Sequence, residues 1–347
     1  MFTLSKTTRG FAATLGTAVL LGLTGVPASA EKVLLKFSTM EPPSGPMVNC
    51  FTLPLLRELS EATGNQIEIE EYMGGTAFAH PLKQYEQVAR GVMDISQGVL
   101  SYTPGQFAMT EIATMPMLAD DAEITSRAVN KLASEYLAEE FKDIHLLAIL
   151  VTPPLSIHLR KSAKGLFDLS GRRIRSTGVG AGAFIDALGA IPVNMPAPAV
   201  YENLQTGVID GAISEFTALK AFKIGEVTDH HILVNTTSAL LFLGMNKAKL
   251  ASLPSETQTL IKTRFSGPDV GARASACWKK MGDAVFADLL SQGQVVIPVS
   301  DADMARAGEI AENITNDYIA KLEADGKPAR AFYDALMAEI ETLTKTP

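Results

Sequence analysis

The chain has 347 residues, of which 47% are hydrophobic and 20% are charged, and its formal net charge is −8. This acidic balance argues against a nucleic-acid partner, because nucleic-acid-binding proteins present basic patches to the phosphate backbone. Beyond the N-terminal segment, no apolar run reaches the ~20 residues that a membrane-spanning helix needs. A chain of this length usually forms about two domains.

The first 30 residues have the three parts of a secretory signal peptide, in the usual order. Lys6 and Arg9 form a positive region, residues 11–26 are an apolar run, and residues 28–30 (ASA) supply a cleavage site before Glu31. The alternative, an N-terminal membrane anchor, is less favoured because the apolar run is shorter than ~20 residues. We therefore predict an exported chain that begins at Glu31, whose formal net charge falls from −8 to −10 when the two basic residues are removed.

Short β-rich runs alternate with helical stretches in the first half of the exported chain. Residues 33–38 and 66–72 alternate in hydropathy as strands do, and a helical pattern between them ends at Gly64. A second helical pattern is stopped by Gly91 and leads into a strand-like run at residues 93–100. Strand–helix–strand units of this length require crossover connections, so we expect a mainly parallel sheet.

The same alternation recurs in the second half and then passes into a helical C-terminal part. Strands are expected at residues 144–151, 155–159 and 172–176, and the chain is mostly helical from Leu253 onward. We therefore predict an α/β fold with two α/β domains and a long C-terminal helical part, in which the cleft between the domains is the default binding pocket. The expected boundaries are 31–153 plus about 241–280 for domain I, and 154–240 plus about 281–347 for domain II.

The chain has two cysteines, Cys50 and Cys277. Export to an oxidising compartment permits a disulfide between them. Two cysteines do not make a disulfide framework, however, and free cysteine is commonly a small, buried, apolar residue. We favour two separate buried thiols, although the sequence leaves the pairing open.

No motif in the sequence assembles catalytic chemistry or a metal site. The five histidines are not spaced with carboxylates or cysteines as metal ligands are, and His230 and His231 are adjacent, so they point in different directions. Neither a Gly-x-Ser-x-Gly nucleophile turn nor a His-Glu-x-x-His zinc motif occurs. We expect a binding protein without a cofactor, while a secreted α/β enzyme such as a hydrolase stays an alternative.

Four segments resemble, in order, the motifs of one family of exported binding proteins. They are residues 71–96, with the run GVMDIS; residues 101–118; residues 168–214, with DLSGRRIRSTG, ALGAIPV and TGVIDG; and residues 244–254, GMNKAKLASLP. The third segment is the most specific, because it is similar to the family pattern D-L-x-G-x-K-I-R followed by A-L-G-A-x-P-V and G-V-x-D-G. The chain thus resembles the DctP-like solute-binding proteins of tripartite ATP-independent periplasmic (TRAP) transporters.

The resemblance implies a periplasmic-binding-protein-like fold, in which two α/β domains joined by hinge strands close around a ligand. It implies a periplasmic receptor that captures a small organic acid and delivers it to the membrane permease subunits of a TRAP transporter, driven by an ion gradient. It implies no reaction and no cofactor, and we expect a monomer. A periplasmic sensor that feeds a signalling partner uses the same fold and stays an alternative.

Arg175 carries the central prediction about the binding site. It matches the arginine of the family's K-I-R motif, which in the family clamps the substrate carboxylate. A guanidinium suits that role because its rigid fork binds a carboxylate through two N–H groups. We expect the preceding Arg172 and Arg173 to be solvated.

Further candidates follow from the same resemblance. Ser214 stands where the family often has a ligand-binding asparagine, and Glu215 beside it is a candidate acceptor for a ligand hydroxyl or amine. Phe216 either stacks on the ligand or packs in the core. Ser156 stands where sialic-acid-binding members carry a second arginine, which weakens the case for sialic acid, and His158 is either a polar contact or a buried structural histidine.

The loops that follow the first strands supply the opposite wall of the predicted cleft. The candidates there are Met40, Glu41, Phe78 and Tyr102, of which Tyr102 either contacts the ligand or braces its own loop. One firm cation among apolar and aromatic neighbours predicts a monocarboxylate with an apolar or aromatic body, or a small 2-oxo or hydroxy acid.

Overall fold

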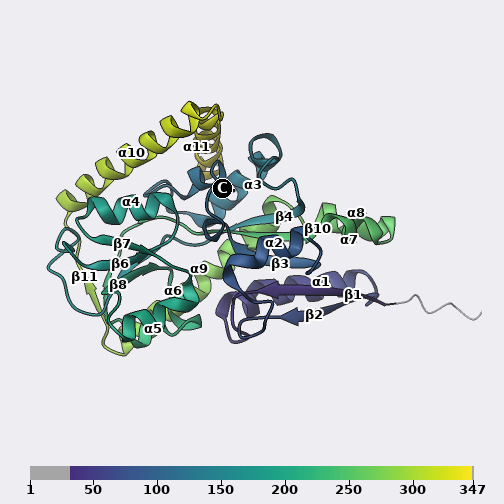
Figure 1. The fold of residues 1–347 in the computed structure, drawn as a ribbon, viewed down its shortest axis with the longest axis horizontal. Coiled ribbons are helices and arrows are strands. Elements are labelled where there is room, and N and C mark those ends of the chain that lie inside the picture. Colours follow the sequence, from purple (N-terminus) through teal and green to yellow (C-terminus); the bar gives the residue numbers. More distant parts are fainter. Residues whose placement is uncertain (1–31, 346–347) are drawn as a thin grey trace, which may run out of the picture. The chain divides into compact units, whose positions relative to one another are not determined.

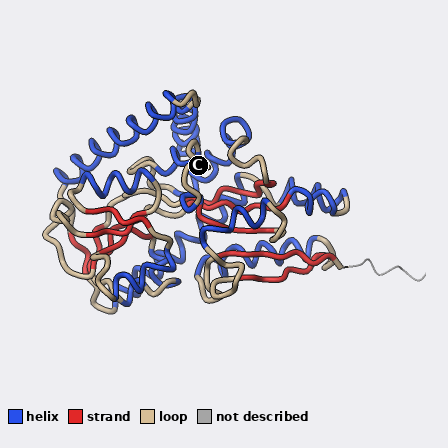
Figure 2. The backbone as a smooth tube through the Cα atoms, in the orientation of Figure 1, coloured by secondary structure: helices blue, strands red, loops and turns tan. Residues whose placement is uncertain are grey.

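The computed structural model describes residues 32–345, so the predicted signal peptide lies outside the described residues. Within this part, eleven strands form two sheets, and helices flank both of them (Figures 1 and 2). From Lys32 onward the chain forms one compact unit. Across residues 32–345 no helix combines the length and the apolar character that crossing a membrane requires.

The first sheet has five strands. They are β1 (Val33–Thr39), β2 (Ile67–Tyr72), β3 (Ile95–Val99), β4 (Ile144–Val151) and β10 (Leu240–Asn246). Their order is β2-β1-β3-β10-β4, with β1 parallel to both β2 and β3 and with β10 antiparallel to β3 and β4. Every residue of β10 is buried, because the strand lies between two neighbours in the middle of the sheet.

The second sheet has six shorter strands. They are β5 (Ser156–Leu159), β6 (Arg173–Ser176), β7 (Ile191–Asn194), β8 (Gly211–Ser214), β9 (His230–Ile232) and β11 (Val295–Ile297). Their order is β11-β9-β5-β8-β6-β7, with β6 parallel to β7 and β8 and with β5 antiparallel to β8 and β9. The parallel pair β6 and β8 therefore ends at one edge of this sheet, where side chains from both strands meet.

The prediction of a mainly parallel sheet is confirmed for most of the strands, but one strand in each sheet, β10 and β5, runs antiparallel to both of its neighbours. For β10 the antiparallel direction follows from the chain's return to the first sheet. The cause is the path of the chain: it leaves the first sheet after β4, builds most of the second sheet, and returns through β10. The returning strand enters the first sheet between β3 and β4 and runs antiparallel to both. Local hydropathy predicts strands at β1 to β6, but the sequence analysis expects no strand at β10, and a local pattern carries no information about this return.

Eleven α-helices accompany the sheets within the described residues. They are α1 (Leu53–Ala62), α2 (Gln84–Ala89), α3 (Ala122–Leu132), α4 (Val179–Ala187), α5 (Val200–Gln205), α6 (Phe216–Ala221), α7 (Lys247–Ser252), α8 (Ser255–Arg264), α9 (Pro268–Ser291), α10 (Asp301–Ala324) and α11 (Ala329–Lys345). The long helix α9 packs against β4 of the first sheet, against α3, and against α6, which follows strand β8 of the second sheet (Figure 1). It therefore connects the two sheets.

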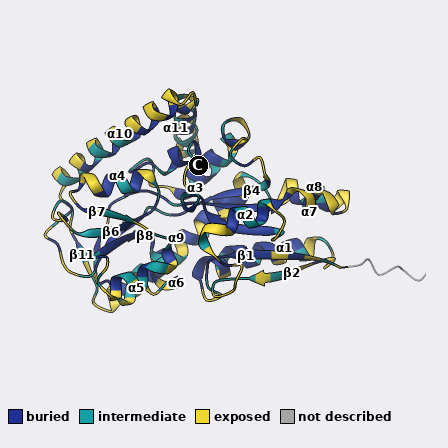
Figure 3. Ribbon diagram, viewed as in Figure 1, coloured by how far each residue is buried: buried dark blue, intermediate teal, exposed yellow. Residues whose placement is uncertain are grey.

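Figure 3 colours most of the strands and the inward faces of several helices as buried. The buried side chains that form this core are mainly aliphatic and aromatic. Phe37 and Leu243 of the first sheet pack in one cluster with Trp278 of α9. Ile174 of β6 packs with Phe184 of α4 in the cluster of the second sheet. Both sheets are thus anchored by buried side chains next to the strand ends that carry the predicted site.

The C-terminal helices divide between the two sheets. α10 packs against α4 beside the second sheet, whereas α11 packs against α3 beside the first. Phe332 and Leu336 of α11 accordingly belong to the same buried cluster as Phe242 of β10. The predicted domain boundaries stay a prediction, because the contacts group the chain from Lys32 onward as one unit.

Cys50 and Cys277 form a disulfide, with their Cα atoms 6.1 Å apart, so the preference for two separate thiols is wrong. Cys50 lies in a short helical segment (Val48–Thr52) after β1, and Cys277 lies in α9. A separation of 227 residues in sequence gives no indication that the fold brings these segments together. The bond fastens the segment after β1 to the helix that connects the two sheets.

Candidate functional site

A cavity of about 60 Å³ lies where the strand ends of the two sheets face each other. Met40 follows β1 and Tyr102 follows β3, while Arg175 and Ser214 lie at the ends of the parallel strands β6 and β8. Ligands of α/β sheets bind at the carboxyl ends of their strands. The polar lining residues are Glu41, Tyr102, Thr152, Arg175, Thr177, Ser214 and Glu215, and the larger apolar ones are Met40, Val99, Leu155, Phe222, Leu241 and Trp278.

Arg175 is held in place by three hydrogen bonds and is only 3% exposed. Its Nε donates to the carbonyl oxygen of Met195 at 2.9 Å, and its Nη1 donates to the carbonyl oxygen of Ile213 at 2.9 Å. Its Nη2 donates to the hydroxyl oxygen of Tyr102 at 3.0 Å. These partners come from both sheets, so the guanidinium is fixed before any ligand arrives.

The guanidinium of Arg175 keeps unused binding capacity. It carries five N–H groups, three of which are occupied, so one on Nη1 and one on Nη2 remain. Among residues 32–345, no carboxylate forms an ion pair with it. A buried charge without a counter-charge is unfavourable unless a partner of opposite sign is supplied.

The hydroxyl group of Tyr102 points to the same requirement. Its oxygen accepts one hydrogen bond from Arg175 and a second from the backbone N–H of Ala197 at 2.8 Å. Both lone pairs are then used, and within the described residues the hydroxyl hydrogen has no acceptor. Tyr102 thus braces the loop of Ala197 and still offers a donor beside the free N–H groups of Arg175.

Two buried carboxyl groups share the cavity with this donor set. The pKa of Glu41 is raised to about 8, chiefly by burial and then by the negative charge of Glu215, while a hydrogen bond from the N–H of Val48 acts in the opposite direction. Burial likewise raises the pKa of Glu215, which caps the start of α6 by accepting from the N–H groups of Thr217 and Ala218 at 2.6 and 2.8 Å. The carboxylate oxygens of Glu215 are therefore used by the N–H groups at the start of α6, whereas the carboxyl group of Glu41 accepts a single hydrogen bond.

Several predicted site residues lie behind the cavity wall. His158 is fully buried, its Nε2 bonds the carbonyl oxygen of Ser214 at 3.0 Å and its Nδ1 bonds Nδ1 of His231 at 2.8 Å. Ser156 pairs with Ser214 across β5 and β8 and is not among the lining residues. Phe216 packs against the rings of His158 and Phe286. These residues support the strand ends from behind.

Phe78 lies outside the cavity. Its side chain is 36% exposed and packs edge-on against Tyr72 of β2, at a centroid distance of 5.0 Å. The expectation that the loop after β2 places an aromatic ring in the site is therefore not matched by the geometry. Its neighbour Gly74 approaches the backbone around Met40 instead.

The two arginines that precede Arg175 are not simply solvated, as the sequence analysis expected. Arg173 forms a two-pronged ion pair with Asp210, through Nε and Nη2 at 3.0 Å each. Arg172 donates to the carbonyl oxygens of Lys161 and Ser162. Strand β6 thus carries one arginine that is neutralised at the surface and one that is buried without a counter-charge.

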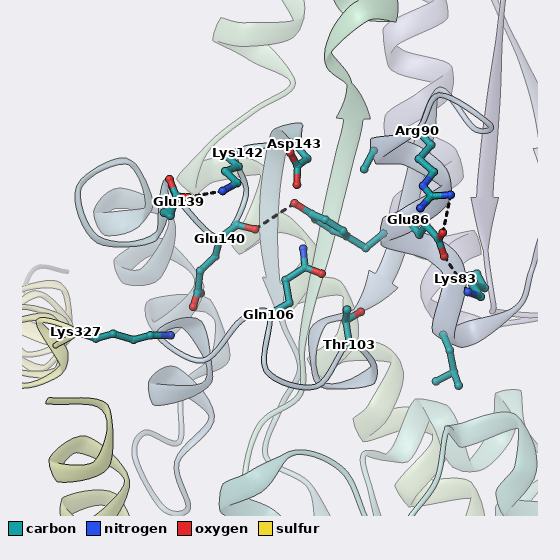
Figure 4. Close-up of a pocket in the computed structure, with 13 residues that line it drawn as sticks. Lys83, Glu86, Arg90, Thr103, Gln106, Glu139, Glu140, Lys142, Asp143 and Lys327 are labelled. Carbon is teal, nitrogen blue, oxygen red and sulfur yellow. Dashed lines mark hydrogen bonds and ion pairs between the residues drawn. The ribbon is translucent and has the colours of Figure 1, made fainter. Parts of the chain in front are cut away.

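A larger groove, with a volume of about 900 Å³, lies between α2, the loop after β3 and the segment before β4 (Figure 4). It is open, and its charges largely neutralise each other: Glu86 pairs with Lys83 at 2.9 Å and with Arg90 at 3.1 Å. The carboxylate of Glu140 accepts from the backbone N–H groups of Met109 and Thr110. The groove is larger than the Arg175 cavity, but its charged side chains are exposed or half-buried rather than buried.

Comparison with known proteins identifies the fold and its role. The profile of the family described as bacterial extracellular solute-binding protein, family 7, matches residues 37–322. The chain belongs to this family. A curated family relative is the C4-dicarboxylate-binding periplasmic protein DctP of Rhodobacter capsulatus, which is 25% identical over 89% of this chain and 95% of its own length.

Solved structures of TRAP solute-binding proteins share the fold. One from Rhodoferax ferrireducens T118, in complex with copurified benzoate, superposes with a TM-score of 0.87 at 26% identity, over 90% of this chain and 99% of that one. Another, from a marine metagenome and in complex with 3-hydroxybenzoate, has a TM-score of 0.85 at 27% identity over the same shares. This family 7 member is thus a TRAP solute-binding receptor and not an enzyme, and the hydrolase alternative is rejected.

Trp278 and Phe222 are cavity residues that the sequence analysis missed. Trp278 is 2% exposed, lies in α9 and follows a disulfide-bonded cysteine, and its indole N–H has no partner within the described residues. Phe222 follows α6 and packs between two buried clusters. The single tryptophan of the chain next to a cysteine was the available signal, but its approach to β1 depends on a long-range contact. The described residues contain no group of side chains that could hold a metal ion.

Proposed function

We propose that this TRAP receptor binds the carboxylate of a small organic acid with an apolar or aromatic body, through the two free N–H groups of Arg175. The single observation that carries the proposal is the buried, unpaired charge of Arg175. A carboxylate supplies the missing negative charge and accepts both remaining N–H groups. The free hydroxyl hydrogen of Tyr102 provides a third donor.

The walls of the cavity support an apolar body for the ligand. Trp278, Phe222 and Leu241 line it together with smaller aliphatic groups, and apolar walls with few polar groups are typical of small-molecule sites. Three structural neighbours, at 26–27% identity, hold benzoate, 3-hydroxybenzoate and mandelate. These ligands are all acids with an aromatic ring, which fits the composition of this cavity.

Calorimetric titration with benzoate and its neutral isostere benzamide tests the proposal. We expect the wild-type protein to bind benzoate and to bind benzamide much more weakly, because only the carboxylate neutralises Arg175. In Arg175→Ala, benzoate binding should weaken by ~2–5 kcal/mol, the usual cost of removing one member of a buried charge pair. Equal affinity for the acid and the amide would contradict the proposal.

Arg172→Ala is the matched control for this titration. It removes the same charge and side-chain type three residues away, but Arg172 bonds only loop carbonyl groups outside the cavity. We expect it to bind benzoate as the wild type does. If Arg175→Ala does not fold, Arg175→Lys replaces it in the titration, because lysine keeps the positive charge but lacks the two parallel N–H groups of the guanidinium. Unchanged benzoate affinity in a folded Arg175 variant would also contradict the proposal.

We further propose that the receptor acts in the periplasm, as a monomer, and delivers its ligand to TRAP membrane permease subunits. The family is extracellular by description, and the first 30 residues have the pattern of a cleavable signal. Mass spectrometry of the secreted protein should find Glu31 as its N-terminal residue. Uptake of a labelled acid should need both the receptor and its permease; uptake that persists without the receptor would contradict delivery.

A further inference from the structure

Glu41 is a buried carboxyl group that the proposed carboxylate clamp does not use. It is the second residue after β1, is 6% exposed and lines the Arg175 cavity. Its Oε2 accepts one hydrogen bond, from the N–H of Val48 at 3.2 Å, and within the described residues its Oε1 has no donor. The carboxyl group therefore keeps hydrogen-bonding capacity at the cavity.

The backbone around Glu41 holds this carboxyl group in place. The carbonyl oxygen of Glu41 accepts from the N–H of Gly74 at 2.7 Å. A Cβ atom at Gly74 would lie 2.7 Å from the carbonyl oxygen of Met40, and one at Gly45 would lie 2.7 Å from Oε2 of Glu41. A side chain at Gly74 would therefore force the backbone around Met40 to move, and one at Gly45 would displace the carboxyl group of Glu41. The disulfide at Cys50 fastens the same stretch to α9.

Glu41 and Arg175 line one cavity without neutralising each other. No nitrogen of Arg175 lies within 4.0 Å of a Glu41 oxygen, since the described residues include no ion pair between them. The charged group that acts on Glu41 is Glu215, on the edge of the second sheet. A cation and a carboxyl group that are both buried and both incompletely bonded leave a space between them for a ligand with complementary groups at two positions.

We propose that Glu41 hydrogen-bonds a hydroxyl group of the bound acid, so that the receptor selects hydroxy acids over the corresponding unsubstituted acids. This inference rests on the proposed function, because it places the ligand carboxylate at Arg175. Glu41 then binds the hydroxyl group at the end of the ligand that extends toward the first sheet. Trp278 and Phe222 enclose the apolar body of the ligand between the contacts to Arg175 and Glu41.

A hydroxyl group is the substituent that suits Glu41 in either protonation state. Because the pKa of Glu41 is about 8, both the acid and the carboxylate are populated near neutral pH. A hydroxyl donates to the carboxylate and accepts from the carboxylic acid, whereas a carbonyl can only accept and an ammonium can only donate. Among the other polar groups of the cavity, Arg175 and Tyr102 offer donors for the carboxylate end of the ligand.

Calorimetric titration of the wild-type protein with benzoate, its 2-, 3- and 4-hydroxy derivatives and 3-methoxybenzoate tests this inference. We expect at least one hydroxybenzoate to bind about tenfold or more tightly than benzoate, because the unsubstituted acid leaves a buried polar group unbonded. The methoxy compound keeps the oxygen but loses the donor. It should therefore bind less tightly than the best hydroxybenzoate.

The same titrations in Glu41→Leu assign the preference to this residue. In Glu41→Leu the ratio of the affinities for the best hydroxybenzoate and for benzoate should fall to less than about threefold, whatever the absolute affinity for benzoate. Glu71→Leu, a change of the same kind at an exposed position of β2, should keep the wild-type preference. If Glu41→Leu does not fold, Glu41→Ala takes its place, with the same expected loss of the preference.

Each result distinguishes the two proposals. If benzoate binds as tightly as every hydroxybenzoate, or if Glu41→Leu keeps the full preference, Glu41 does not read a hydroxyl group and this inference is overturned while carboxylate binding stands. If no benzoate derivative binds but neutral compounds do, the proposed function fails and the inference fails with it. A hydroxyl preference that is lost in Glu41→Leu supports both.

Discussion

The Arg175 cavity and the open groove of Figure 4 differ in size and in how far their charges are satisfied. The groove is about 900 Å³, and its lysines, arginines and glutamates largely pair with each other. The cavity is about 60 Å³ and buries an arginine without a counter-charge beside an incompletely bonded carboxyl group. Unsatisfied buried groups, and not volume, distinguish the cavity that we propose as the binding site.

The cavity wall is also fastened covalently, whereas no disulfide borders the groove within the described residues. We predict that Cys50→Ser together with Cys277→Ser lowers the free energy of unfolding by ~3–4 kcal/mol, because the bond closes a long loop. Denaturant unfolding of the oxidised wild type and of the double variant measures this. Equal midpoints would contradict the predicted contribution, and reduction of the wild type should reproduce the effect of the variant.

The raised pKa of Glu41 predicts that the stability of the folded protein falls as the pH rises. Its pKa rises from 4.5 to about 8 on folding, chiefly through burial. The folded protein thus binds the Glu41 proton more tightly than the unfolded chain does. The contribution of this proton to the free energy of unfolding is fully present below about pH 4.5 and is lost as the pH rises through about 8. The side chain of Glu41→Gln stays neutral at every pH. In denaturant unfolding, the free energy of unfolding of this variant should exceed that of the wild type by about 2 kcal/mol or more at pH 8 and match it near pH 4. A constant difference between the two proteins across this range would contradict the assignment.

Tyr102 tests whether the donors around Arg175 act together. Tyr102→Phe removes the free hydroxyl hydrogen and also leaves N–H groups of Arg175 and Ala197 without their acceptor. We expect benzoate affinity to fall about tenfold, which is ~1.4 kcal/mol, while the protein stays folded. Tyr201→Phe, at a partly exposed position of α5, is the matched control and should bind normally. Unchanged affinity in Tyr102→Phe would show that its hydroxyl does not face the ligand.

A substitution in the groove should have the smallest effect on stability and on acid binding. Lys142 is 60% exposed and pairs with Glu139 at 2.5 Å, three residues before it. Because exposed ion pairs contribute ~0–1 kcal/mol, Lys142→Ala should change stability by less than about 1 kcal/mol and leave acid binding unchanged. Thermal unfolding with and without benzoate measures both quantities. Loss of the benzoate-induced shift in this variant would place the site in the groove and reverse the comparison.

Local sequence patterns predict most of the strands and the principal cation. The strand at residues 144–151 is observed as β4 with the same bounds, and the family motif singles out Arg175, which the fold places at the cavity with Tyr102, Ser214 and Glu215. Hydropathy and motif matching succeed here because these features depend on residues that are close in the sequence.

The remaining features depend on contacts between distant segments. The antiparallel return of β10, the bond between Cys50 and Cys277, and the approach of Trp278 to the strand ends all arise from tertiary packing. The same holds for Arg173, whose ion pair with Asp210 requires β6 and β8 to be neighbours. Position in a motif separates Arg175 from Arg173, but only the fold shows which of them lacks a counter-charge.

A crystal structure of the protein with 3-hydroxybenzoate tests the central claim most directly. The account predicts that the acid occupies the cavity, with its carboxylate oxygens ~2.7–3.1 Å from the two free N–H nitrogens of Arg175. Burial of the ligand against Trp278 should accompany this contact. A ligand bound in the groove near Lys142, or one whose carboxylate lies away from Arg175 within the cavity, would contradict it.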